Sequence, residues 1–192
     1  MNHFFAYINR TKYIRRWGLM RNTEEESLSE HLYQTSILAH ALAVIDRTIF
    51  GGDCDEGRVT LAALYHDAGE IITGDLPTPI KYYNDDIKRA YHKIEDETCE
   101  MLLSKLPAEL RDSYADILTC STLTEHERRI VKAADTLGAY IKCLEEKKAG
   151  NRDFDGAATS TEKKLDEFNL PCLDYFRREF LSSYNLTIDE MR

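Results

Sequence analysis

The chain has 192 residues, of which 43% are apolar and 31% charged, so its length fits one domain with a sizeable core. Its net charge of −9 argues against a basic surface for a nucleic-acid polymer, and no apolar run approaches the ~20 residues that a membrane span needs. Five cysteines, an odd number without a C-x-x-C pair, indicate reduced thiols in a cytoplasmic protein rather than a disulfide framework.

The first half of the chain predicts helices with short connections. Residues 2–16 carry apolar side chains at roughly helical spacing. Ser27 and Glu30 form the S-x-x-E pattern of a capping box, which predicts the start of a long helix. Another helix is expected from about residue 56 to residue 72, followed by the loop TGDLPTPIKYYN, in which glycine and proline oppose regular structure.

The second half begins with equally clear helix signals. Residues 84–105 predict a long amphipathic helix. Pro107 is expected at the first position of the next helix, where a missing N–H is tolerated. Thr124 and Glu127 form a second capping box, for a helix that extends to about residue 148.

The C-terminal residues also predict helices, and together with the preceding segments they indicate the fold class. Two shorter helices between residues 158 and 182 are separated at Leu170–Pro171. No stretch carries a convincing strand pattern. The sequence therefore predicts an all-α protein, a single-domain helical bundle over residues 1–192. Its core would lie at about 28–148, with C-terminal helices at about 158–192 packing on it.

Four polar residues interrupt apolar helix faces where a core would favour leucine or alanine: His31, His66, Asp67 and Asp135. Two imidazoles and two carboxylates, with no thiolate, suit Mn²⁺, Fe²⁺, Co²⁺ or Zn²⁺. One cation would offset the desolvation of all four groups. Taken singly, His31 also fits a core or capping histidine, and Asp135 fits a salt bridge to a neighbouring lysine, so the residues alone leave both interpretations open.

These residues also carry a resemblance to a known family. The order H…HD…D resembles the HD-domain superfamily of metal-dependent phosphohydrolases, and several longer blocks are similar to the YfbR-like bacterial 5′-deoxynucleotidases. The blocks occur in the family's order and are distributed along most of the chain, from residue 3 to residue 176: HFFAYINR, RRWGLMRN, SEHLYQTSILAHALA, YHDAGEIITGDLPTPIKY, VKAADTLGAYIKCLEE and DYF.

The resemblance implies a function and a set of site residues. It implies an all-helical HD domain, a cytoplasmic homodimer, and removal of phosphate from deoxyribonucleoside 5′-monophosphates with one divalent metal ion per chain, Co²⁺ or Mn²⁺ first, with Zn²⁺ or Fe²⁺ as alternatives. It places the metal on His31, His66, Asp67 and Asp135, and catalytic roles on Glu70, Asp75 and Arg16. It places substrate contacts on Arg16, Trp17, His31, Asp67, Asp75, Leu76, Pro77, Thr78 and Asp135.

Elementary chemistry is consistent with these implied roles. Glu70 lies four residues after His66, so on a continuous helix both would project from nearly the same face. Asp75 lies in a proline-stiffened loop, which suits proton transfer. Arg16 offers a planar, permanently charged fork for a phosphate, and Trp17 offers a wall for the sugar or base. Glu70 as an orienting carboxylate and Asp75 as a turn residue remain simpler alternatives.

Two other functions fit the same residues. An HD-type hydrolase of nucleoside triphosphates or alarmones would keep the metal site, although more phosphates usually require more lysine and arginine. A helical dimer that binds metal or nucleotide without catalysis would have a closed coordination sphere. His92 lies among charged residues and His126 lies half a helical turn from Asp135, so one metal ion is expected rather than two.

Overall fold

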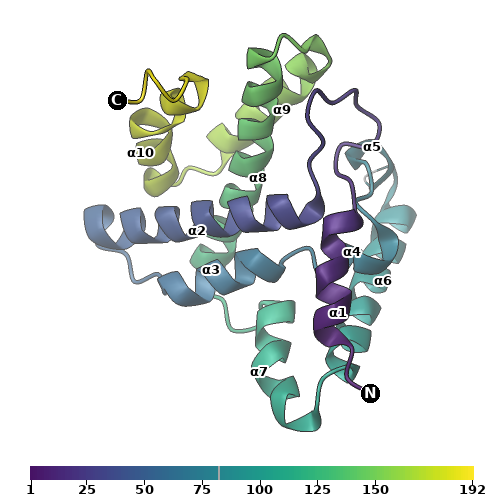
Figure 1. Ribbon diagram of the computed structural model, residues 1–192. Coiled ribbons are helices and arrows are strands. Elements are labelled where there is room, and N and C mark those ends of the chain that lie inside the picture. Colours follow the sequence, from purple (N-terminus) through teal and green to yellow (C-terminus); the bar gives the residue numbers. More distant parts are fainter. Residues whose placement is uncertain (82) are drawn as a thin grey trace. The chain divides into compact units, whose positions relative to one another are not determined.

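Helices form nearly all the regular structure of the computed structural model, which describes residues 1–81 and 83–192 (Figure 1). The α-helices in the described residues are α1 (Phe4–Ile8), α2 (Leu28–Phe50), α3 (Glu56–Tyr65), α4 (Glu70–Thr73), α5 (Thr78–Lys81), α6 (Asp85–Ser104), α7 (Ala108–Thr119), α8 (Glu125–Lys148), α9 (Asp155–Glu167) and α10 (Pro171–Glu179). Short 3-10 helices occupy Asn9–Tyr13, Arg152–Phe154 and Leu181–Asn185. The predicted all-α class is confirmed.

Both predicted capping boxes are confirmed. Glu30 Oε2 accepts a 2.7 Å hydrogen bond from the Ser27 backbone N–H, and Ser27 Oγ accepts a 3.3 Å bond from the Glu30 N–H. At α8 the Thr124 side chain accepts from the Glu127 N–H, and Glu127 Oε2 accepts from the Thr124 N–H. These reciprocal bonds satisfy N–H groups that the first turn of a helix leaves without an intrahelical partner.

Four predictions differ from the structure. The expected helix over 2–16 is divided at Ile8, where a 3-10 turn begins and the Thr11 hydroxyl donates to the Ile8 carbonyl. The expected helix over 56–72 ends at Tyr65. The loop after residue 73 contains α5, and Pro107 is the N-cap of α7 rather than its first residue.

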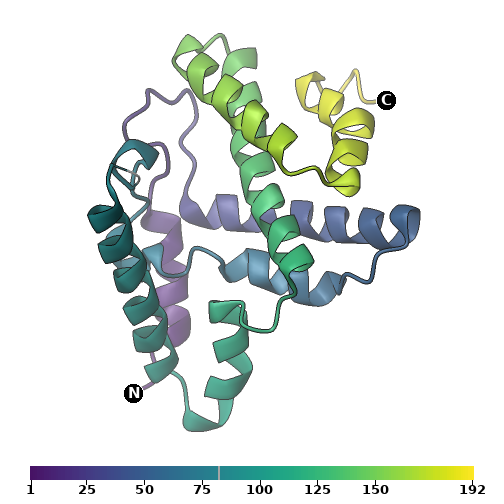
Figure 2. The ribbon, with the colours of Figure 1, turned by 180° about the vertical axis from the view of Figure 1, so that it is seen from behind.

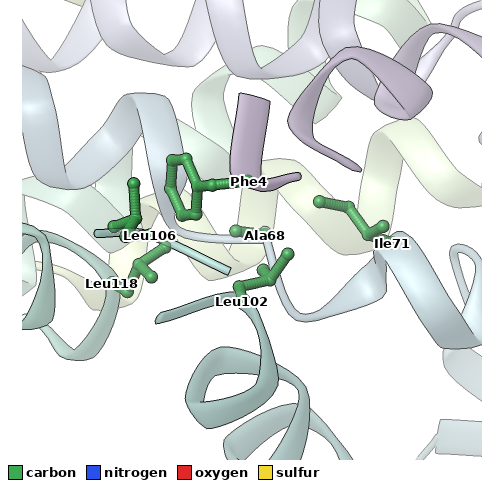
Figure 3. Packing of buried hydrophobic residues seen from close by; sticks show 6 residues of the cluster. All are labelled: Phe4, Ala68, Ile71, Leu102, Leu106 and Leu118. Carbon is green, nitrogen blue, oxygen red and sulfur yellow. The ribbon is translucent and has the colours of Figure 1, made fainter. Parts of the chain in front are cut away.

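The chain divides into two compact units, and the first consists of Met1–Arg21, Glu25–Tyr33 and Tyr65–Thr122. In this unit α6 is the central element, in contact with α1, α4, α5 and α7; Figure 1 shows α1 and α6 side by side. A buried apolar cluster includes residues of α1, α4, α6 and α7 (Figure 3), and its members are Phe4, Ala68, Ile71, Leu102, Leu106 and Leu118.

The second unit consists of Asn22–Glu24, Gln34–Leu64 and Leu123–Arg192. Here α9 runs back along α8 (Figure 2), and the 3-10 helix before α9 also packs on α8. Phe154 and Ile141 are fully buried in this unit. Within the described part of the chain, no helix is both long enough and apolar enough to cross a membrane.

Candidate metal and phosphate site

Three of the four predicted metal ligands come together in the first unit. His31 lies in the first turn of α2, directly after the Ser27 cap, and is completely buried. His66 and Asp67 occupy the turn that follows α3, with only 13% and 20% of their side chains exposed. One ligand atom from each of the three residues lies within 4.8 Å of the others, and the two imidazole ring centroids are 5.5 Å apart.

The chemistry of this donor set fits a divalent cation. Two imidazoles and a carboxylate are ligands that Zn²⁺ and the neighbouring transition metals accept. His66 Nε2 also lies 3.1 Å from Asp67 Oδ2, so the imidazole and the carboxylate converge on the same small volume. Three ligands around one ion leave coordination positions for water and substrate.

Asp135, the fourth predicted ligand, lies in α8 and is partly buried. It belongs to the second unit, so its participation in the metal site stays a prediction. Of the lysines near Asp135 in the sequence, Lys142 donates a 2.5 Å hydrogen bond to Glu146.

The turn over residues 66–70 is where the structure corrects the sequence argument about Glu70. The turn closes through i-to-i+3 hydrogen bonds, from Ala68 N–H to Tyr65 O (2.9 Å) and from Glu70 N–H to Asp67 O (2.9 Å). Glu70 therefore begins a new helix, and one-turn spacing on a continuous helix does not explain its position. Ala68 belongs to the buried apolar cluster (Figure 3), so the turn contributes a side chain to the core of its unit.

Gly69 fits this turn closely because the turn packs directly on α6. A Cβ atom added at Gly69 would lie 3.1 Å from Glu95 Cβ and 3.2 Å from Glu95 Cα. Such distances are shorter than ordinary carbon–carbon contacts. The close approach therefore holds the turn, and with it Asp67 and Glu70, against the central helix of the unit.

Glu70 is a buried carboxyl group, 3% exposed, close to other acidic groups. Burial raises its pKa, and the charges of Asp67 and Asp75 raise it further, to about 9, although Lys81 and Arg16 act in the opposite direction. Its Oε2 atom is buried without a hydrogen-bond partner among the described residues. A cation beside these carboxylates would relieve both the crowding and the missing interaction.

Two residues that the sequence reasoning missed support Glu70. The Tyr91 hydroxyl of α6 has one proton to donate, and it lies 3.4 Å from Glu70 Oε1 and 3.3 Å from the Gly74 carbonyl oxygen. Lys81 Nζ lies 3.7 Å from Glu70 Oε1, 3.1 Å from Glu95 and above the Tyr91 ring. No spacing rule connects α6 to Glu70, although the position of Lys81 at the end of the TGDLPTPIK block was a usable signal.

Arg16 lies among three carboxylates of the same unit. Its NH1 atom is 3.7 Å from Asp67 Oδ2 and 3.7 Å from Asp75 Oδ1. Its Nε donates to Glu26 Oε2 at 3.2 Å. The structure thus brings together Arg16, Asp67 and Asp75, which were predicted to contact substrate, and adds Glu26, which was not predicted. The Arg16 guanidinium therefore lies beside the Asp67 carboxylate, which is a predicted metal ligand.

The loop from Asp75 to Thr78 leaves α4 at Gly74, whose φ of 73° is a conformation that glycine adopts readily. Asp75, Leu76 and Pro77 are partly buried, and Thr78 is exposed at the start of α5. Trp17 is also partly buried, beside Arg16. Substrate contacts of Leu76, Pro77, Thr78 and Trp17 remain predictions.

Two other histidines are each paired with a carboxylate. His92 Nδ1 lies 3.0 Å from Glu95 Oε2, and His126 Nε2 lies 3.1 Å from Asp46 Oδ2. Among the described residues, the only group of three or more potential ligands close enough to hold an ion is the set of His31, His66 and Asp67. A single metal ion per chain stays the prediction.

Sequence comparison identifies relatives over the full chain. A model of the YfbR-like 5′-deoxynucleotidases matches residues 3–184. A 5′-deoxynucleotidase of Photorhabdus laumondii is 48% identical over 191 residues, which cover 100% of this chain and 97% of that protein. A 5′-deoxynucleotidase of Vibrio atlanticus is 45% identical over 190 residues, 99% of this chain and 98% of that protein.

Structural comparison identifies the same architecture. An HD-domain phosphohydrolase from Listeria innocua aligns with a TM-score of 0.83 at 21% identity, over 95% of this chain and 88% of that one. The HD phosphohydrolase of cyanophage S-2L, bound to dA and one catalytic Zn²⁺ ion, aligns with a TM-score of 0.67 at 20% identity, over 95% and 96% of the two chains. These similarities confirm the predicted HD-type fold.

Proposed function

Because the chain belongs to the YfbR-like 5′-deoxynucleotidase family, we infer that it is a phosphoric monoester hydrolase acting on deoxyribonucleoside 5′-monophosphates. One structural observation supports this function above the others. Arg16 NH1 lies 3.7 Å from both Asp67 and Asp75, which brings a phosphate-binding cation to a metal-ligand carboxylate. With a metal ion bound at Asp67, that arrangement can hold one terminal phosphoryl group between the ion and the Arg16 guanidinium.

The metal would be held by His31, His66 and Asp67, with Asp135 as a proposed fourth ligand. Co²⁺ or Mn²⁺ is proposed, and the donor set also accepts Zn²⁺ and Fe²⁺. A divalent ion in such a site supplies a Lewis acid for the phosphoryl group and lowers the pKa of water from about 15.7 towards 7.

The remaining steps belong to side chains of this chain. Arg16 binds the phosphate dianion through its guanidinium. Glu70 and Asp75 hold and move protons between water and the leaving 5′-oxygen. Trp17 contacts the nucleoside, and residues 76–78 border the substrate. Lys81 and Tyr91 hold Glu70 and the Gly74 carbonyl in place.

A phosphate-release screen tests this function. Purified protein is incubated with ribo- and deoxyribonucleoside mono- and triphosphates and with Mn²⁺, Co²⁺, Mg²⁺ or Zn²⁺. We expect release from deoxyribonucleoside monophosphates, its loss with a chelator, and its recovery when Co²⁺ or Mn²⁺ is added back. Preferred release from triphosphates would favour the alternative HD-type hydrolase, and metal binding without any release would favour a non-catalytic role.

Metal content tests the ligand set separately. We expect His66→Ala and Asp135→Ala each to lower the metal-to-chain ratio measured by plasma mass spectrometry. His92→Ala is the matched control, because His92 is paired with Glu95 on α6, and it should keep the wild-type ratio. An Asp135→Ala variant with unchanged metal affinity would remove Asp135 from the site.

We propose further that the protein is a homodimer in the cytoplasm, as the resemblance implies, and that its two units together form one HD domain. Sedimentation equilibrium of the full chain measures its oligomeric state directly. A mass equal to one chain, 22.2 kDa, at micromolar concentration would contradict the dimer.

A further inference from the structure

Glu26 is a buried carboxylate that joins two residues of the proposed substrate site. Its Oε2 atom accepts a 2.9 Å hydrogen bond from Trp17 Nε1 and a 3.2 Å bond from Arg16 Nε. The residue is 9% exposed. One oxygen atom thus binds the indole and the guanidinium of adjacent residues, each through a different donor.

The local backbone explains why Glu26 faces Arg16. Arg15 and Ser27 form an isolated antiparallel bridge, with bonds from Arg16 N–H to Glu26 O and from Leu28 N–H to Ile14 O, both 2.9 Å. In an antiparallel pair, residues opposite each other share one face, and the neighbouring pair uses the other. Arg16 and Glu26 are therefore opposite each other by register.

The opposite face of the same antiparallel pairing carries a second arginine–glutamate ion pair, which is exposed to solvent. Arg15 NH2 lies 2.9 Å from Glu25 Oε2, with 56% and 68% of the two side chains exposed. Two arginine–glutamate pairs therefore occur in consecutive residues, one enclosed and one in solvent. An exposed pair contributes little to stability, which makes Glu25 a matched control for Glu26.

Trp17 has a backbone conformation that needs support. Its φ is 58°, in the left-handed region that bulky residues rarely adopt and that is typical of functional sites when it occurs. The indole bond to Glu26 fixes the side chain of this residue. Because the same oxygen also binds Arg16, the directions of the two side chains depend on each other.

We propose that Glu26 is a positioning residue, which sets the Arg16 guanidinium and the Trp17 indole for the phosphate and the nucleoside of one substrate. The proposal rests on the function inferred above. Glu26 binds the Nε atom of Arg16, while the terminal NH1 atom lies on the side of the site where Asp67 and Asp75 are found. A single anchoring oxygen thereby couples phosphate binding to nucleoside binding.

If Glu26 acted only through its negative charge, its removal would change phosphate affinity in the opposite direction from that expected for a positioning residue. Glu26 is an anion near the proposed binding site for an anionic substrate, so removal of its charge alone would strengthen phosphate binding. A positioning role predicts weaker binding when the acceptor is lost. The direction of the change in phosphate affinity therefore separates the two roles.

The experiment uses Glu26→Ala, Glu26→Gln and the control Glu25→Ala in the full chain. Glutamine keeps an acceptor oxygen without the charge, and alanine removes both. Trp17 is the only tryptophan, so intrinsic fluorescence reports on this residue alone. The measurements are acrylamide quenching of Trp17, inhibition by inorganic phosphate, kcat/KM for dAMP, and thermal unfolding to verify folding.

For Glu26→Ala we expect stronger acrylamide quenching, weaker inhibition by phosphate, and kcat/KM reduced about tenfold or more, since a hydrogen bond to a charged group is lost. Glu26→Gln should recover most of the wild-type quenching and activity, and Glu25→Ala should match wild type. Wild-type quenching and activity in Glu26→Ala, or tighter phosphate binding in both Glu26 variants, would overturn the proposal. If wild-type protein fails to hydrolyse dAMP, the inferred function fails, while quenching and phosphate binding still test Glu26.

Discussion

At the scale of single residues, an acidic protein can bind an anion through a few well-placed groups. The chain carries a net charge of −9, yet Arg16 is almost enclosed, with 11% of its side chain exposed, beside Asp67 and Asp75. A charge in such surroundings is screened much less than one at the surface. The local site, rather than the net charge, then determines whether phosphate binds.

Replacing Arg16 by alanine tests this point. We expect inorganic phosphate to inhibit about tenfold or more weakly, because a charge-assisted hydrogen bond is lost, while metal content is unchanged. Arg15→Ala is the matched control, since Arg15 is exposed and paired with Glu25. Equal phosphate inhibition in Arg16→Ala and wild type would remove Arg16 from the phosphate site.

Replacing Glu70 by glutamine tests its proposed role in proton transfer. The change keeps the shape of the side chain and removes the titratable group, so kcat should fall by about 10²–10⁴-fold with metal still bound. Glu97→Gln is the control, because Glu97 is largely exposed and pairs with Lys93 on α6. Activity within twofold of wild type would show that Glu70 is structural; kcat and plasma mass spectrometry provide the measurements.

At the scale of elements, the break between α3 and α4 determines where the predicted metal ligands His66 and Asp67 lie. A continuous helix over 56–72 would place His66 and Glu70 one turn apart. The structure instead ends α3 at Tyr65 and turns the chain so that Ala68 enters the apolar cluster. Burial of Ala68 and the approach of Gly69 to α6 are tertiary effects that outweigh the local helical pattern.

Replacing Gly69 by alanine should misplace this turn. The new Cβ would meet Glu95 Cα at 3.2 Å, so the turn must shift by a few tenths of an ångström. Small displacements of catalytic groups are costly, and we expect kcat to fall about tenfold, with a destabilisation of about 1–3 kcal/mol from overpacking.

The control for that variant is Gly156→Ala in α9, where a Cβ would meet no atom within 4 Å. Alanine is a better helix former than glycine by up to about 1 kcal/mol. The melting temperature of the Gly156→Ala variant should therefore equal or exceed that of wild type, with kcat unchanged. A Gly69→Ala variant that behaves like Gly156→Ala would contradict the close-packing argument. Both variants are compared by kcat and thermal unfolding.

At the scale of the whole molecule, buried ionic clusters link segments distant in sequence. In the second unit, Glu146 accepts hydrogen bonds from Lys142, Asn151 and both the backbone and the hydroxyl of Thr23. Burial alone would raise the pKa of Glu146, but these bonds outweigh it and lower the pKa to about 2. The cluster ties residues 22–24 to α8.

Because of this cluster, the free energy of unfolding should decrease as the pH is lowered into the acid range. A carboxyl group whose pKa is lower in the folded state stabilises the protein above its unfolded pKa of 4.5 and loses that effect as the pH falls towards 2. For Glu146, which is 1% exposed, the contribution is about 3 kcal/mol. Denaturant unfolding between pH 5 and pH 2 should show the loss.

Glu146→Gln should flatten that pH dependence, because the titrating group is gone, and should also lower stability at pH 7, where Lys142 loses its charged partner. Glu145→Gln is the control, one residue away and exposed. A Glu146→Gln variant with the wild-type slope of unfolding free energy against pH would show that other carboxylates account for the acid sensitivity.

The sequence by itself determined what depends on neighbouring residues along the chain. Helical periodicity, the capping boxes at Ser27 and Thr124, and the family blocks fixed the all-α class, most helix boundaries and the metal-ligand candidates. These signals are local: each one involves side chains within about one helical turn, or a run of residues that can be read directly.

Only the tertiary structure decided which distant groups meet. The end of α3 at Tyr65, the bonds from Tyr91 to Glu70 and the Glu26 oxygen shared by Arg16 and Trp17 all arise between segments that no periodic pattern relates. Burial and close packing select these contacts, because a buried polar group must find a partner in space rather than in sequence. For this reason the sequence predicted candidate metal ligands but not the residues that hold them in position.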